Sequence, residues 1–243
     1  MPTPTVVLVH GAFADSSSWN EVVARMDEDD VPVVAVANPL RGLAEDARYL
    51  SDVLDAVAGE VVLVGHCYGG MVITEAGSRD AVTALVYVSA FAPDHGESAD
   101  ELSRRFPGST LGDTVARYPV RSGGRELVVR REAFADQLAA DVPRPLAAAM
   151  SVTQRPVAEG ALSDTVESTV PAWRTRPSWF VYGDADRSIP TAVLRFMADR
   201  ADAVVRRVLW DGPHALGVSR PDDVADVILE AVAAVGTGGR PAD

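Results

Sequence analysis

Residues 61–71 read VVLVGHCYGGM, and this stretch decides the fold. The apolar run VVLV at 61–64 predicts a strand that is buried on both faces, and the apolar residues from Met71 onward predict a helix. Between them, the residues GHCYG at 65–69 leave room only for a sharp turn. Strand, turn and helix in this order are typical of one unit of a parallel α/β sheet.

The turn has the pattern G-x-nucleophile-x-G, with Cys67 in the nucleophile position. In this pattern the central residue has a strained backbone, and side chains two positions before and after it would clash, so glycines stand at 65 and 69. The N-terminus of the following helix stabilises a thiolate and a developing oxyanion. A buried structural cysteine is the alternative interpretation. Strand, glycines and helix in register favour the nucleophile.

Apolar runs of the same kind recur along the chain, at 5–9, 31–37, 84–91, 178–182 and 204–210, with helical patterns between them. Strands that alternate with helices form βαβ units. We therefore predict an α/β fold with a mostly parallel sheet covered by helices on both faces.

The alternation stops between residues 94 and 171, where helix-like segments follow one another and RSGGRELVV at 121–129 suggests a hairpin. An insertion into an α/β core explains this interval better than a second independent domain. We predict a core of residues 1–93 and 172–243 and a mainly helical cap of residues 94–171. The cap is expected over the end of the sheet where open α/β folds bind ligands.

A second candidate element is HGAF at residues 10–13, directly after the first predicted strand. In elbow enzymes, backbone N–H groups at this point and after the nucleophile form an oxyanion hole. The predicted donors are Ala12, with Phe13 as the alternative, and Tyr68. For His10 itself we favour a structural role, with its side chain bonding to backbone.

The third element is WFVYGDADRSIP at 179–190, in which two aspartates follow a strand. A carboxylate in such a loop can accept the Nδ1–H of a catalytic histidine and stabilise the imidazolium. Asp184 and Asp186 both qualify at this point, and a solvated loop acid or helix cap is the alternative for either one.

The catalytic base is predicted by elimination among the four histidines of the chain. His10 is assigned to a turn, His66 lies in the elbow, and His95 lies in the entry to the cap. His214 comes just after the last predicted strand and before the final amphipathic helix, so it can reach over the sheet edge to a nucleophile.

Composition removes several classes of function. Thirty-five acidic residues against 22 basic ones, all of them arginine, give a net charge of −13 that disfavours nucleic acids and membrane surfaces. One cysteine excludes an intrachain disulfide framework and a thiolate zinc cluster. No metal-ligand spacing and no phosphate-binding glycine loop occurs, so no metal or cofactor is expected. The sequence shows no membrane span or secretory pattern, and we expect a cytoplasmic protein.

Five segments together resemble motifs of the α/β-hydrolase superfamily: HGAFADSSSW, GHCYGG, YVSAFAPDHGES, GDADRSIP and PHALGVSRP. Over almost the whole chain they are similar to small cofactor-free bacterial hydrolases that resemble plant methyl esterases and hydroxynitrile lyases. The resemblance implies an α/β-hydrolase fold with nucleophile, acid and histidine in that order.

Carried over by position, the resemblance assigns the nucleophile to Cys67, the base to His214 and the acid to Asp186, which fills the D-x-x-I-P position. Asp94 is a weaker alternative acid. The oxyanion donors are Ala12 and Tyr68, and Phe13 is expected to contact substrate.

The sequence departs from this family at position 67, where serine is usual. Cysteine nucleophiles occur on the same fold in enzymes resembling dienelactone hydrolase and in polyester synthases. Three interpretations follow: a Cys-His-Asp triad that acts on activated acyl groups, a serine replaced in order to trap an acyl-enzyme, or a site that no longer hydrolyses. We favour the first, because a thiolate forms near neutral pH without a concerted base.

The expected function is therefore hydrolysis of a small carboxylic ester, thioester or lactone through an acyl-enzyme intermediate. An acyltransferase, a lyase or cyclase that uses the same site, and a small-molecule binding protein of low turnover are the alternatives. The expected partner is the small-molecule substrate, and a homodimer is left open.

Overall fold

Six parallel strands form the central sheet in a computed structural model that describes residues 2–121 and 123–236. The strand order is β2-β1-β3-β4-β8-β9, and every neighbouring pair is parallel. The carboxyl ends of all six strands therefore lie at one edge of the sheet. Each predicted apolar run overlaps one strand: β1 Thr5–Val9, β2 Val33–Val36, β3 Val61–His66, β4 Val82–Val88, β8 Ser178–Gly183 and β9 Val205–Leu209.

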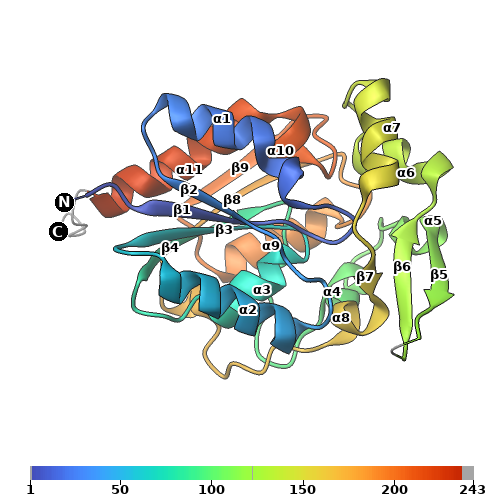
Figure 1. Cartoon of the computed structure of the whole chain (residues 1–243), viewed down its shortest axis with the longest axis horizontal. Helices are drawn as coiled ribbons and strands as arrows, with labels where there is room; N and C mark the ends of the chain where they lie inside the picture. The colour runs from blue at the N-terminus through green and yellow to red at the C-terminus, as the bar shows by residue number, and fades with distance from the viewer. Residues whose placement is uncertain (1, 122, 237–243) are drawn as a thin grey trace.

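Helices cover both faces of this sheet, as predicted (Figure 1). On one face lie α1 Asn20–Glu28 and α11 Pro221–Gly236, and on the other lie α2 Leu43–Ala56, α3 Gly69–Ala76 and α9 Thr191–Arg200. Successive residues of β3 alternate between the two cores: Val62 and Val64 pack with α1 and α11, whereas Leu63 packs with α2 and α3. Burial on both faces explains why the strands are apolar throughout.

Two helices bury apolar residues that recur at helical spacing in the sequence. In α2 these residues are Leu43, Ala47, Leu50 and Leu54, and in α11 they include Val224, Val227, Ile228, Ala231 and Val232. Val57 follows the end of α2 and is only partly buried. Amphipathic spacing therefore identified which face of each helix meets the sheet.

The segment between β4 and β8 lies beyond the carboxyl ends of the strands, at the right of Figure 1. It contains five helices: α4 Ala99–Arg104, α5 Leu111–Thr114, α6 Arg131–Leu138, α7 Arg144–Thr153 and α8 Glu159–Ser163. The predicted hairpin is present as β5 Val115–Pro119 and β6 Arg125–Val129, and a short third strand, β7 Val157–Ala158, completes an antiparallel sheet. The boundaries of this cap, residues 94 and 171, remain a prediction from the sequence.

The loop before α2 ties the cap to the core. The Ala158 backbone N–H donates to the Leu40 carbonyl at 3.0 Å. The Arg41 guanidinium donates to the Pro156 carbonyl at 2.8 Å and also pairs with Glu126 of the cap sheet. These contacts hold the cap sheet against the edge where the strands end.

The remaining elements are two short 3-10 helices, Ser16–Trp19 and Ala172–Arg174, and the one-turn helix α10 Leu216–Ser219. Within the described residues, no helix combines the length and apolar character needed to cross a bilayer.

The tight packing of the turn after β3 predicts how a substitution at Gly69 changes the stability of the protein. A Cβ atom on Gly69 would lie 2.3 Å from the Val9 carbonyl oxygen, so Gly69→Ala should lower the free energy of unfolding by about 3 kcal/mol, the upper end for overpacking, because the obstacle is backbone. The matched control is Gly160→Ala in α8, where a Cβ meets nothing within 4 Å. This control should be neutral or stabilising by about 0.4–1 kcal/mol. Urea unfolding of both variants measures the difference, and equal stabilities would contradict the packing described for the turn.

Candidate active site

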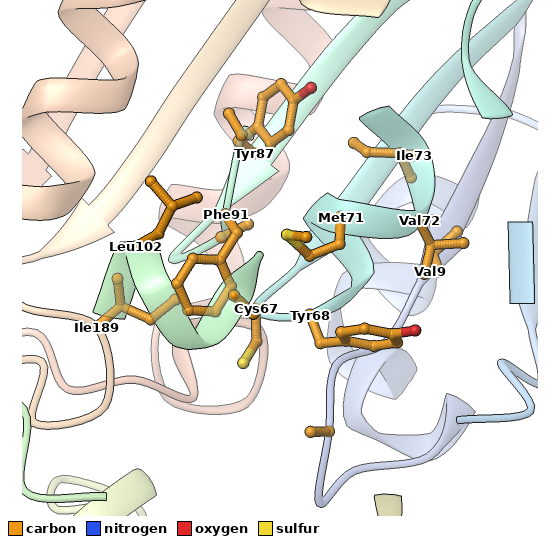
Figure 2. Packing of buried hydrophobic residues seen from close by; sticks show 14 of the residues in the cluster. Val9, Cys67, Tyr68, Met71, Val72, Ile73, Tyr87, Phe91, Leu102 and Ile189 are labelled. Carbon is orange, nitrogen blue, oxygen red and sulfur yellow. The ribbon is translucent and has the colours of Figure 1, made fainter. Parts of the chain in front are cut away.

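Cys67 occupies the strained position of the turn between β3 and α3. Its φ is +52°, in the left-handed region that residues other than glycine seldom adopt. A Cβ on Gly65 would lie 2.7 Å from the Gly69 carbonyl oxygen, so the glycine two positions before Cys67 is needed as predicted. Figure 2 shows the Cys67 sulfur pointing away from Met71. The thiol is thus held at the carboxyl end of β3, at the start of a helix.

His214 and Asp186 come together from two different loops. The Asp186 loop follows β8, and His214 follows β9. The His214 Nδ1–H donates to Asp186 Oδ2 at 2.7 Å. The other carboxylate oxygen, Oδ1, accepts the backbone N–H groups of Ser188 at 2.7 Å and Ile189 at 3.0 Å. Both oxygens are therefore fixed, and the imidazole is held with its second nitrogen free for another partner.

The Cys67 side chain lies near enough to His214 to influence the charge of the imidazole. Burial alone would lower the pKa of His214, but the negative charges of Asp186 and Cys67 outweigh it and raise this pKa well above its usual value. A buried imidazole between two anionic groups favours the imidazolium form. The arrangement therefore favours a protonated His214 beside Asp186.

The predicted oxyanion loop adjoins the elbow. A Cβ on Gly11 would lie only 2.5 Å from the Cys67 Cβ, so the loop after β1 touches the residue at the turn. Phe13 has a φ of +60°, a second strained residue in this loop. Among the described residues, the backbone N–H groups of Ala12, Phe13 and Tyr68 donate to no backbone carbonyl. None of the three amides is thus engaged by backbone, which agrees with the prediction for an oxyanion donor.

The two alternative acids have other partners. Asp184 Oδ1 accepts the Asp211 backbone N–H at 2.7 Å, which joins the loops after β8 and β9. Asp94 forms an ion pair with Arg174, and this pairing helps to lower the pKa of the Asp94 carboxyl despite partial burial. Neither carboxylate is hydrogen-bonded to His214, which leaves Asp186 as the residue that fits the predicted role.

The other histidines have structural contacts. The His66 Nε2–H donates to the His214 carbonyl at 3.0 Å, and burial together with the nearby His214 charge lowers the pKa of His66 to about 3. The His10 Nδ1–H donates to the Gly11 carbonyl at 2.9 Å, the backbone bond expected for it. His95 is exposed. His66 therefore supports His214 through the backbone of that residue.

A mainly apolar cavity adjoins His214 and Ala12. Its walls come from the core and from α6 and α7 of the cap, and the lining includes Phe13, Trp19, Phe134, Leu138, Met150 and Val218. A second, more polar cavity continues from it past Phe13, Met150 and Val218 to Asp15, Glu21 and Gln154. The two cavities thus share part of their lining, the first being mainly apolar beside His214 and the second having acidic side chains in its wall.

Sequence reasoning missed two features of this site. The first is the set of cap residues on the cavity wall, which no sequence pattern distinguishes from ordinary core. The second is Asp46, fully buried in α2, whose carboxylate accepts the Tyr68 hydroxyl. The sequence did contain a signal for Asp46, which lies three residues after Leu43 and four before Leu50 and therefore falls among the apolar residues on one face of the helix.

No cluster of metal-ligating side chains occurs among residues 2–121 and 123–236.

The fold and the arrangement of this site define a class. Residues 6–227 match the alpha/beta hydrolase family, and the chain belongs to that family.

Individual relatives resemble the chain over less than half of its length or at low sequence identity. The chain is 34% identical to a carbendazim hydrolyzing esterase of Nocardioides sp. over 108 residues, which are 38% of the chain and 44% of that protein. It is 32% identical to the probable hydrolase R7 of Phoma sp. over 117 residues, which are 42% of the chain and 48% of that protein. The chain thus spans about half the length of these curated relatives. Among solved structures, polyneuridine aldehyde esterase superposes with a TM-score of 0.81 at 18% identity, covering 94% of this chain and 99% of that one, a likeness of fold.

The contacts of the two loop aspartates predict that replacing Asp186 lowers the catalytic rate strongly and that replacing Asp184 changes it little. Asp186→Asn should lower the hydrolysis rate of an activated ester by about 10²–10⁴-fold, because an amide can favour the wrong imidazole tautomer. Asp184→Asn is the matched control, since an asparagine Oδ1 can still accept the Asp211 N–H. The measurement is kcat for both variants, in the Cys67 protein and in Cys67→Ser. A larger loss from Asp184→Asn in both backgrounds would show that the acid is misassigned.

Proposed function

We propose that this protein hydrolyses a small carboxylic ester, thioester or lactone through a Cys67-His214-Asp186 triad and an acyl-enzyme intermediate. The observation that carries the proposal is the position of His214, which is hydrogen-bonded to Asp186 at 2.7 Å and lies near the Cys67 side chain. A nucleophile that contacts a base, which is in turn oriented by an acid, is the general arrangement for covalent catalysis.

In the proposed reaction, the Cys67 thiolate attacks the carbonyl carbon and forms a sulfur–carbon bond, while His214 holds the thiol proton. The electron pair of the carbonyl moves to its oxygen, which accepts N–H groups of Ala12, or of Phe13, and of Tyr68. The tetrahedral intermediate then collapses, and His214 gives its proton to the leaving oxygen or sulfur. An acyl group remains on Cys67.

The second half of the reaction uses the same groups. His214, now neutral, takes a proton from water as the water oxygen attacks the acyl carbon, and the same amides hold the oxyanion. Collapse breaks the sulfur–carbon bond, releases the carboxylic acid and restores the thiolate–imidazolium pair. Asp186 keeps Nδ1 protonated throughout and stabilises each imidazolium stage.

The cavity beside His214 supports the choice of a small, uncharged leaving group. His214 must reach the leaving atom to protonate it, so the leaving group lies next to this residue. The inner lining there is apolar, and Asp15 and Glu21 at the outer cavity would repel an anion. Both observations favour an apolar alcohol or thiol as the product of the first half-reaction.

The names of similar proteins support ester cleavage. The Nocardioides relative is a carbendazim hydrolyzing esterase, and polyneuridine aldehyde esterase has the same fold. A thiol nucleophile favours acyl groups with good leaving groups, such as thioesters, lactones and aryl esters. A cytoplasmic location remains a prediction from the sequence, which leaves a homodimer open.

Two changes test the proposal. Alkylation of Cys67 with iodoacetamide should abolish ester hydrolysis, because Cys67 is the sole cysteine of the chain. His214→Ala should lower kcat by about 10²–10⁴-fold, the usual contribution of a general acid–base group, with an unchanged circular dichroism spectrum. The matched control is His95→Ala, since His95 is exposed and lies in the cap.

Near-full activity of His214→Ala would refute the assignment of the base. If the protein turns over no ester but is stabilised against heat by ester analogues, it is a binding protein. If it turns over substrate and iodoacetamide leaves the rate unchanged, the chemistry is acid–base chemistry without an acyl intermediate.

A further inference from the structure

A buried polar pair links the elbow to helix α2. The Tyr68 hydroxyl donates to Asp46 Oδ2 at 2.8 Å, and both residues are fully buried. The second carboxylate oxygen, Asp46 Oδ1, accepts the Arg41 backbone N–H at 3.0 Å. The carboxylate therefore receives one donor from the elbow and one from the loop before α2.

Packing alone does not require this pair. A phenylalanine and a leucine would fill nearly the same space without a buried hydroxyl and carboxylate, and replacing buried polar pairs by apolar residues is often neutral or stabilising. Burial raises the pKa of Asp46, and the hydrogen bonds from Arg41 and Tyr68 oppose that effect. Desolvation of the pair thus destabilises the folded state, whereas the hydrogen bond to Asp46 fixes the direction of the Tyr68 side chain.

The position of Tyr68 explains what this contact can do. The Tyr68 carbonyl accepts the Met71 backbone N–H at 2.9 Å in the first turn of α3, and its hydroxyl is held by Asp46. Its backbone N–H donates to no carbonyl in the described part of the chain. Figure 2 shows the Tyr68 ring extending away from the Cys67 sulfur. Two of the three polar groups of Tyr68 are therefore anchored, and the third is the predicted oxyanion donor.

We propose that Asp46 is a positioning residue for the oxyanion hole, which acts by holding the Tyr68 ring and thereby fixing the direction of the Tyr68 amide N–H beside Cys67. The inference rests on the proposed function and adds a residue to it. Donors to a developing oxyanion must be preorganised to within a fraction of an ångström, so an anchor on the adjacent side chain affects the transition state more than the bound substrate.

The experiment uses two reagents that differ in whether they form an oxyanion. An aryl trifluoromethyl ketone adds to the thiolate by a sulfur–carbon bond, and its carbonyl oxygen becomes an anion in the oxyanion hole. Iodoacetamide also forms a sulfur–carbon bond, but iodide leaves and no oxyanion arises. The variants are Tyr68→Phe, Asp46→Leu, Asp46→Asn and the double variant Tyr68→Phe/Asp46→Leu.

In Tyr68→Phe and Asp46→Leu we expect kcat for an aryl ester to fall about 10-fold, less than the roughly 10²–10³-fold for complete loss of an oxyanion donor. The inhibition constant of the ketone should rise by a similar factor, while KM and the rate of alkylation by iodoacetamide stay unchanged. Asp46→Asn keeps an acceptor for the Tyr68 hydroxyl and should recover part of the loss. Asp55→Asn is the control, because Asp55 lies on the same helix, is exposed, and pairs only with Arg79 among the described residues.

The double variant separates positioning from stability, since it removes the Tyr68 hydroxyl and the Asp46 carboxylate together. The one group that loses its acceptor is the Arg41 backbone N–H, which is only partly buried. If it folds with normal thermal stability and kcat stays low, the proposal holds. If kcat and the inhibition constant return to the values of the unsubstituted protein, the pair is merely structural and the proposal is overturned. Failure of the proposed function looks different: the unsubstituted protein would neither turn over ester nor bind the ketone, and the inference would fall with it.

Discussion

The close approach of the loop after β1 to the turn after β3 is the constraint on which the site depends. Gly11 and Gly69 both lie where a Cβ would collide, with the Cys67 Cβ at 2.5 Å and with the Val9 carbonyl at 2.3 Å. The strand neighbours β1 and β3 are parallel and in register, so their ends meet at one level. This contact holds the loop that contains Ala12 against the turn that contains Cys67.

The titratable side chains of the site meet at this same edge of the sheet. Three strands, β3, β8 and β9, deliver Cys67, Asp186 and His214 from positions far apart in the chain. Because all three residues are buried, the imidazole of His214 is screened little from the two acidic groups beside it. The cap closes over this edge and supplies Phe134 and Met150 to the cavity wall. The ends of the strands thus bring Cys67, Asp186 and His214 together, and the cap contributes part of the cavity wall beside them.

Much of this arrangement could be predicted from the sequence, because its signals are local. Buried strands, the elbow glycines and the D-x-x-I-P spacing at Asp186 are each contained in a few residues. What escaped prediction depends on distant contacts. Strand β7 has two residues and exists because Val157 and Ala158 pair with β6. The role of Asp46 required the knowledge that α2 packs against the elbow.

The central claim is that Cys67 forms a covalent acyl intermediate. The most direct measurement is intact mass after rapid acid quench of the protein mixed with p-nitrophenyl acetate, with Cys67→Ala alongside. We expect a gain of one acetyl group, located on Cys67, that rises to a constant level as nitrophenol release reaches its steady rate and disappears once the ester is consumed, and no gain in Cys67→Ala. Turnover of the ester without any mass gain, or an equal gain in Cys67→Ala, would contradict it.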